Sequence, residues 1–164
     1  MAIAEPYNSP SPSWLDTLIG LFKKPARLQV AALCYRLTDH GPEILLLTSR
    51  GKGRWILPKG WPELHFASHV TASIEAFEEA GIRGEVEPKP YASFKSHKGL
   101  EKGIDIRTTV LVYLVKVTEE LDDYPEKGQR QVKWFPVADA VEQVDEPALK
   151  PILEAFGKDM TGNR

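Results

Sequence analysis

The sequence predicts an α/β (α+β) domain in which helices cover both faces of a central mixed sheet. Strand-like and helix-like segments alternate along the 164 residues, without an internal repeat. The apolar run Ile44–Leu47 has the composition of a strand that is buried on both faces. Such a strand needs a covering layer on each side, and a chain of this length is long enough to supply one.

Six apolar segments separated by turn residues are predicted to be the strands of this sheet. Asp39–Pro42 marks the turn between the first two, and Pro58 and Gly60 mark the loop that follows the third. The loop 96–103 is predicted to separate the fourth strand from the fifth. The predicted strands are Arg27–Tyr35, Glu43–Thr48, Arg54–Leu57, Tyr91–Phe94, Arg107–Val117 and Val132–Phe135.

The main helix is predicted to begin near Ser68 and to stop at Gly81. The Ser68 hydroxyl can cap the first turn, and glycine readily adopts the left-handed conformation that ends a helix. Val70, Ile74 and Phe77 recur at helical spacing, which predicts that they pack against the sheet. The two further predicted helices are Val137–Val144 and Pro147–Phe156.

The chain is predicted to consist of an N-terminal extension (1–26), one domain (27–158) and a short tail (159–164). Within the extension, Trp14 and Leu18 fit one face of a short amphipathic helix. We expect that helix to dock on the domain or on a second copy of the chain. A helix at a membrane surface is the alternative, which the few basic residues disfavour.

Composition narrows the class of protein. Hydrophobic residues make up 42% and charged residues 27% of the chain, as in ordinary globular proteins. The net charge of -2 argues against binding of long nucleic acids. The sequence has a single cysteine, and it shows no stretch long enough to span a bilayer and no basic, cleavable leader. We therefore expect a cytoplasmic monomer or small homo-oligomer without a transmembrane segment.

Three glutamates on the main helix point to metal chemistry. Glu75, Glu78 and Glu79 stand at i, i+3 and i+4, so their carboxylates crowd one helix face and repel one another. A divalent cation would turn that repulsion into coordination, and hard oxygen ligands suit Mg²⁺ or Mn²⁺. The alternative is the solvated acidic face of an ordinary helix. The pattern favours a metal-assisted reaction on phosphates.

The chain resembles the Nudix hydrolase family in the spacing of these glutamates and of the residues around them. Gly60, the three glutamates, Gly81 and Ile82 fit the Nudix box, G-x5-E-x7-R-E-U-x-E-E-x-G-U, where U is a bulky aliphatic residue. The segments Thr48–Arg50 and Arg54–Gly60 are similar to the diphosphoinositol polyphosphate phosphohydrolase and diadenosine polyphosphate hydrolase branch. The resemblance covers most of the chain and implies the Nudix α/β/α sandwich with a central mixed sheet.

Two charged positions of the box depart from the family pattern. Phe66 stands in place of the first glutamate, and Ile74 stands in place of the arginine that helps to orient the catalytic glutamates in the family. Because Ile74 extends the apolar stripe, packing is expected to hold the helix in place instead. The resemblance thus implies a modified active site that keeps the three glutamates closest to the chemistry.

The resemblance also implies a role for each site residue. Glu75, Glu79 and the backbone carbonyl of Lys59 would ligate the metal, and Glu78 would be the general base. Cationic and hydroxyl side chains would bind the phosphates of the substrate. The candidates for that role are Arg27, Thr48, Ser49, Arg50, Lys98, Lys102 and Arg130.

The predicted function is that of a metal-dependent Nudix pyrophosphohydrolase, which cleaves a diphosphate bond in a polyphosphorylated small molecule. The resemblance implies an inositol pyrophosphate or a diadenosine polyphosphate as the substrate. One alternative is a degenerate Nudix domain that binds nucleotide or polyphosphate without efficient hydrolysis. Another is a housekeeping or RNA-end-processing hydrolase that uses the same residues, because the box does not encode the leaving group.

Overall fold

The computed structural model describes residues 27–99 and 105–162. The strands in these ranges are β1 (Arg27–Thr38), β2 (Gly41–Thr48), β3 (Trp55–Ile56), β4 (Lys59–Gly60), β5 (Ile82–Val86), β6 (Ala92–Gly99), β7 (Asp105–Glu120) and β8 (Val132–Pro136). The helices are α2 (Ser68–Ala80), α3 (Val137–Gln143) and α4 (Lys150–Gly162). The amphipathic helix expected in the N-terminal extension lies outside the described residues.

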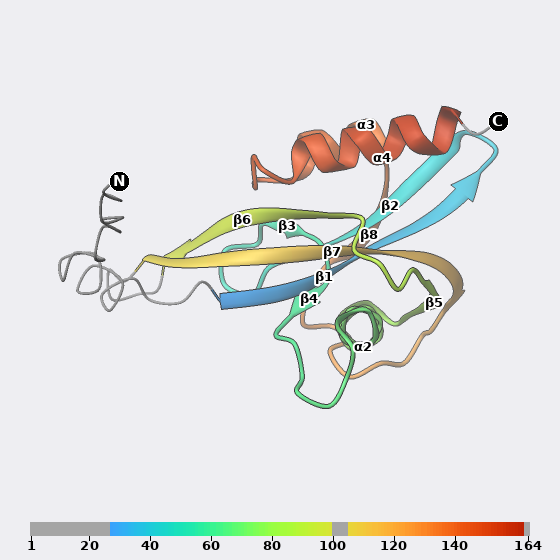
Figure 1. Cartoon of the computed structure of the whole chain (residues 1–164). Helices are drawn as coiled ribbons and strands as arrows, with labels where there is room; N and C mark the ends of the chain where they lie inside the picture. Colours follow the sequence, from blue (N-terminus) through green and yellow to red (C-terminus); the bar gives the residue numbers. More distant parts are fainter. Residues whose placement is uncertain (1–26, 100–104, 163–164) are drawn as a thin grey trace, which may run out of the picture.

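All eight strands belong to one sheet, whose central path runs β3-β2-β1-β7-β5 (Figure 1). β8 pairs with β2, β4 with β1, and β6 with β7. β1 and β7 run parallel, with Arg27 opposite Thr108 and Tyr35 opposite Lys116. The other pairs are antiparallel. The prediction of a mixed sheet is therefore confirmed.

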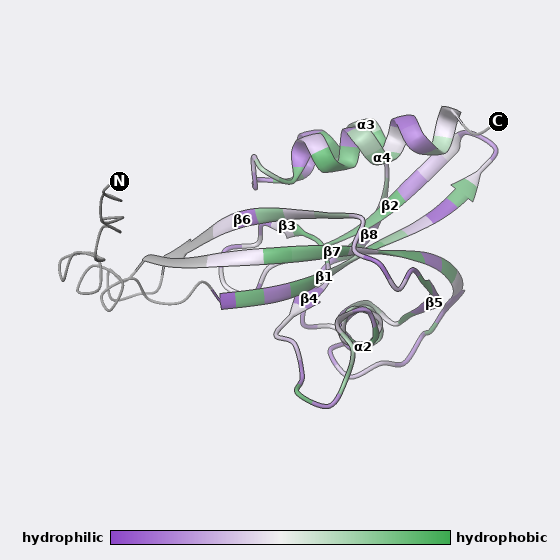
Figure 2. Cartoon of the chain, viewed as in Figure 1, coloured by the Kyte–Doolittle hydropathy of each residue, from purple (hydrophilic) through white to green (hydrophobic). Residues whose placement is uncertain are grey.

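Helices cover both faces of this sheet. α2 lies on one face and α3 and α4 lie on the other (Figure 1). One buried cluster joins Leu153 and Phe156 of α4 to the sheet, and a second joins Ala72 and Ala76 of α2 to the opposite face. Figure 2 shows hydrophobic residues along the central strands between these two layers. The structure confirms the predicted α/β/α sandwich.

β2 shows why the sheet needs a layer on each side. Ile44 and Leu46 pack in the cluster under α3 and α4, whereas Leu45 and Leu47 pack in the cluster under α2. All four are at most 1% exposed. Side chains alternate between the two faces of a strand, so an unbroken apolar run is buried on both sides. The prediction for Ile44–Leu47 is confirmed.

The structure has two strands that the sequence analysis did not predict. β4 is only two residues long, and the sequence predicts a loop there because Pro58 and Gly60 are turn residues in most contexts. β5 follows Gly81 directly and pairs with the end of β7. Its sequence alternates Ile82 and Val86 with polar and glycine positions too briefly to be distinguished from a connecting segment.

The predicted loop 96–103 is wrong for its first half. β6 continues to Gly99, and its partner β7 begins at Asp105. The ladder runs from Ala92 opposite Val112 to Gly99 opposite Asp105, so cross-strand pairing carries polar residues that have little strand propensity of their own.

α4 begins later and ends later than predicted. Leu153, Phe156 and Met160 continue one apolar stripe against the sheet, so the helix runs through Gly162 and past position 158. The domain bounds themselves stay a prediction. None of the helices within the described ranges is long and apolar enough to cross a membrane.

Candidate active site

α2 approaches the sheet through small side chains. Ala72, Ala76 and Ala80 are buried against the sheet, and their size lets the helix backbone lie close to it. Gly81 ends the helix with a φ of 67°, and its N–H donates to the carbonyls of the last turn, as predicted. The predicted Ser68 cap is wrong, because Ala67 occupies the N-cap position and no side chain caps this end.

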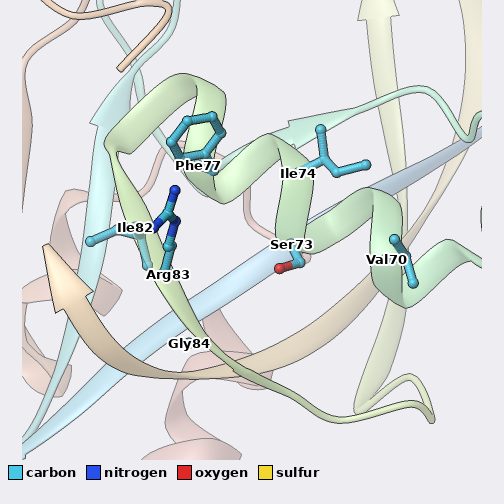
Figure 3. Close-up of a pocket in the computed structure, with 7 residues that line it drawn as sticks. All are labelled: Val70, Ser73, Ile74, Phe77, Ile82, Arg83 and Gly84. Atoms are coloured by element: carbon cyan, nitrogen blue, oxygen red, sulfur yellow. The ribbon is translucent and has the colours of Figure 1, made fainter. Parts of the chain in front are cut away.

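The predicted packing face of α2 is also wrong. Val70, Ile74 and Phe77 are only partly buried and line a shallow groove between α2 and β5 (Figure 3). Arg83 crosses this groove, with its guanidinium carbon 5.5 Å from the centre of the Phe77 ring. The large apolar residues thus face outwards, and the alanines, which carry a weak hydrophobic signal, face the core.

The three glutamates differ in their surroundings. Glu79 is buried, and its Oε2 accepts a hydrogen bond from the backbone N–H of Lys59 at 3.0 Å. Glu75 lies against Gly60, where an added Cβ would collide with the Glu75 carboxylate. Glu78 is exposed. β4 and α2 therefore hold two carboxylates close to the Lys59–Gly60 backbone and present the third to solvent.

Burial and mutual repulsion act on the two inner carboxylates. Burial, and then the charges of Glu79 and Glu78, raise the pKa of Glu75 to about 7. Burial also raises the pKa of Glu79, although the Lys59 N–H and the Arg130 guanidinium oppose that shift. A cation placed among these carboxylates would relieve both the repulsion and the cost of burial.

Arg130 connects Glu79 to the rest of the site. Its Nη2 donates to Glu79 Oε1 at 2.5 Å, its Nε to Glu126 Oε2 at 2.9 Å, and its Nη1 to the Thr48 carbonyl at 3.2 Å. Arg50, whose side chain is exposed, lies 3.6 Å from Glu126 Oε1. The structure thus brings Thr48, Arg50 and Arg130 together with the glutamates of α2.

Glu126 is a residue of this site that the sequence analysis missed. Its charge acts on both Glu75 and Glu79, and its backbone N–H donates to the Glu78 carbonyl at 3.0 Å. Its position in a polar loop between β7 and β8 resembles any solvated turn, so the sequence contains no signal that separates it from its neighbours.

The other predicted substrate-binding residues lie in several places. The Ser49 hydroxyl accepts the Arg54 N–H, and the Thr48 hydroxyl accepts the Gln131 N–H, each at 3.0 Å, so both hydroxyls brace the loop after β2. Arg27 lies over the ring of Trp61, 5.8 Å from its centre. Of the two predicted lysines, Lys98 is on β6, and Lys102 lies outside the described residues.

The donor set fits a hard divalent cation that also binds phosphate. No three His, Cys, Asp or Glu side chains in the described ranges converge as a self-sufficient metal cage. Mg²⁺ needs no such cage, because it is usually held by one or two carboxylates, with water and substrate phosphates as its remaining ligands. The inner pair, Glu75 and Glu79, together with the carbonyl of Lys59, are the donors that such an ion would use.

Comparison with known proteins places the chain in a family. A model of the NUDIX domain matches residues 27–156. The chain belongs to the Nudix family. Nudix hydrolases act on pyrophosphate bonds, so this protein is a hydrolase of that class. Members of the family generally use divalent metals such as Mg²⁺.

Curated relatives narrow the comparison. Diphosphoinositol polyphosphate phosphohydrolase 3-beta of Bos taurus is 33% identical to this Nudix hydrolase over 122 residues, which span 73% of this chain and 68% of the relative. The human 3-alpha protein of the same name is 31% identical over 149 residues, spanning 87% and 84%. Nudix hydrolase 21, chloroplastic, of Arabidopsis thaliana is 30% identical over 138 residues, spanning 79% and 66%.

Solved structures share the fold. The binary complex of the C. elegans Ap4A hydrolase superposes with a TM-score of 0.66 at 20% identity, covering 84% of this chain and 99% of that one. The NUDIX domain of Shewanella oneidensis NrtR complexed with ADP ribose gives a TM-score of 0.61 at 17% identity, covering 86% and 96%. At such identities the likeness concerns the fold alone.

Proposed function

We propose that this Nudix hydrolase depends on Mg²⁺ or Mn²⁺ and cleaves a diphosphate bond in a polyphosphorylated small molecule. The observation that carries the proposal is the half-buried carboxylate of Glu75 held beside Glu79 and Gly60, where burial and repulsion call for a cation. The names of the curated relatives support an inositol pyrophosphate as substrate. A diadenosine polyphosphate carries the same dense negative charge and is the second proposed substrate.

Each residue has a distinct role in this proposal. Glu75, Glu79 and the Lys59 carbonyl would hold the ion, which would supply charge neutralisation on the phosphate oxygens and would make a water molecule more acidic. Glu78, the exposed glutamate, accepts the proton of that water. The water oxygen bonds to phosphorus as the bridging P–O bond breaks, and the leaving phosphate takes the electron pair.

Substrate phosphates need cations at the mouth of the site. Arg50 is the best placed, because its side chain is 65% exposed and lies beside Glu126. Arg27, Lys98 and Lys102 stay predictions for more distant phosphates, and the hydroxyls of Thr48 and Ser49 shape the loop that carries Arg50. The cytoplasmic location and the monomeric or small homo-oligomeric state also stay predictions.

A substrate panel tests the proposed activity. Purified protein is incubated with inositol pyrophosphates, diadenosine polyphosphates, nucleoside diphosphate derivatives and 5′-triphosphate RNA, with Mg²⁺ or Mn²⁺, at neutral and alkaline pH. We expect metal-dependent release of phosphorylated products from the small molecules in preference to RNA. Hydrolysis that persists in chelator, or a preference for RNA ends, would contradict the proposal.

The assignment of the general base is tested by Glu78→Gln. Loss of a general base lowers kcat by about 10²- to 10⁴-fold, and the exposed position of Glu78 should leave folding intact. Glu154→Gln, at an exposed position on α4, is the matched control. Turnover of the Glu78 variant equal to that of the control would overturn the assigned role.

Phe66 and Ile74 favour a second candidate function, binding without efficient hydrolysis. Both side chains are apolar and supply no charge to the glutamates of α2. Phe66 is 48% exposed, and Ile74 lines the groove between α2 and β5. Calorimetry with the same panel separates the two functions. Tight binding of a polyphosphate without product formation would favour the second.

A further inference from the structure

We infer that Arg130 is a positioning residue that fixes the carboxylate of Glu79 and does not contact the substrate. The inference rests on the proposed function for the metal-binding role of Glu79. It gives Arg130 a different role from the substrate contact that the family resemblance implies.

The guanidinium of Arg130 is committed to acceptors inside the protein. Its side chain is 5% exposed, and Nε, Nη1 and Nη2 each donate to a different acceptor. The acceptors come from three segments: Glu126 in the loop before β8, the Thr48 carbonyl at the end of β2, and Glu79 on α2. A guanidinium offers donors in one rigid plane, so three such bonds fix its orientation.

The backbone around Arg130 is fixed as well. Gln131 and Thr48 exchange two hydrogen bonds: the Thr48 N–H donates to the Gln131 carbonyl at 2.9 Å, and the Gln131 N–H donates to the Thr48 hydroxyl at 3.0 Å. Glu126, at the other end of the turn, is tied to α2 through the Glu78 carbonyl. Arg130 therefore reaches Glu79 from a loop segment whose two ends are held by hydrogen bonds.

Glu79 is held on both of its oxygens. Lys59 N–H binds Oε2 and Arg130 binds Oε1, which leaves the carboxylate no freedom to rotate about its terminal bond. Each oxygen keeps a second lone pair that an ion can use. Partners of this kind behind a metal ligand set its orientation, and their loss typically costs about 10- to 100-fold in metal affinity or activity.

A substrate contact and a positioning role predict different kinetics for Arg130→Gln. If Arg130 positions Glu79, kcat for diadenosine polyphosphates falls by about 10- to 100-fold, while KM stays within about threefold for chains of three to six phosphates. Arg130→Lys keeps the charge but loses the planar fork, and it should recover only part of kcat. A KM that rises with phosphate number while kcat is retained would overturn the inference.

Two measurements test Arg130 even if no panel compound is hydrolysed. In calorimetry with Mn²⁺ alone, Arg130→Gln should bind at least about tenfold more weakly than wild type. In urea unfolding, Arg130→Gln should lower the midpoint concentration. Adding Glu79→Gln to that variant should raise the midpoint again in part, because it removes the buried charge that Arg130→Gln leaves unpaired. Arg36→Gln breaks ion pairs with Glu43 and Glu120 away from the site, so it should leave Mn²⁺ affinity unchanged. Its effect on the urea midpoint should simply add to that of Glu79→Gln. Unchanged Mn²⁺ affinity in Arg130→Gln, or additivity with Glu79→Gln, would overturn the inference.

Discussion

The raised pKa of the Glu75 carboxyl group makes the stability of the fold depend on pH. Burial and then the neighbouring glutamates raise its pKa from 4.5 to about 7 in the folded protein. A group whose pKa is raised by folding adds stability that is complete below its unfolded pKa. That stability is lost as the pH rises through the folded pKa, because the folded state then has to hold the charged form.

The free energy of unfolding of the metal-free protein should therefore fall between about pH 4.5 and about pH 7. One pKa unit corresponds to about 1.4 kcal/mol, and partial exposure of Glu75 reduces the whole change to roughly 1–3 kcal/mol. Glu75→Gln removes the titrating group and should flatten this slope. Urea unfolding at a series of pH values in chelator measures it.

Glu154→Gln is the control for that experiment, because it removes one glutamate from the exposed side of α4. Its stability should follow the wild-type slope. If the unfolding free energy of Glu75→Gln falls with pH as steeply as that of the control, then titration of Glu75 is not the cause of the fall.

At the scale of the element, α2 is positioned by residues with small side chains. Ala76 is fully buried between α2 and the sheet, whereas Ile74 on the neighbouring face lines the open groove. Ala76→Leu should cost about 1–3 kcal/mol through over-packing, and it should move the glutamates away from β4. Ile74→Ala removes a partly exposed side chain and should cost about 1 kcal/mol or less.

Denaturant unfolding of the two variants, together with their kcat values, measures this difference. The α2 geometry described above requires the alanine position to be the sensitive one. A larger loss of stability in Ile74→Ala than in Ala76→Leu would mean that the apolar stripe, and not the alanine face, packs on the sheet.

This helix also shows what sequence can and cannot predict. Its C-terminus follows from Gly81, whose left-handed φ is a local property, and the buried strand Ile44–Leu47 follows from composition. The packing face does not follow, because hydrophobic periodicity weights Val70 and Phe77 more heavily than alanine. Which face of a helix meets a sheet depends on how closely the two backbones approach, and that is a property of the assembled layers.

The candidate site divides in the same way. The glutamates of α2 share one short segment, so their spacing from one another and from Gly60 and Gly81 makes them candidates from the sequence. Arg130 and Glu79 are 51 positions apart and meet through the arrangement of β2, α2 and the loop before β8. Glu126 carries no distinguishing sequence context. Contacts of this kind are set by topology, so the sequence indicates the candidate metal-binding glutamates but not the hydrogen-bond network around them.

Across the whole molecule, the proposed metal site brings together parts of the chain that lie far apart in the sequence. β4 contributes Lys59, α2 contributes Glu75 and Glu79, and the loop before β8 reaches the cluster through Arg130. An ion bound there would connect the sheet to the helix that covers it. Metal binding should therefore be coupled to global unfolding, since an unfolded chain does not bring these donors together.

We expect Mn²⁺ or Mg²⁺ at about 100 times its dissociation constant to stabilise the protein by about 2.7 kcal/mol. For a domain of this size that corresponds to a rise in Tm of roughly 5–11 °C. Thermal unfolding at increasing metal concentration measures the rise, and the double variant Glu75→Gln with Glu79→Gln should abolish it. All samples are kept in Ca²⁺-free buffer at the same ionic strength, so that binding at the site is distinguished from general screening of charges by salt. An equal rise in wild type and the double variant would place the ion elsewhere and would remove the α2 carboxylates from the proposed mechanism.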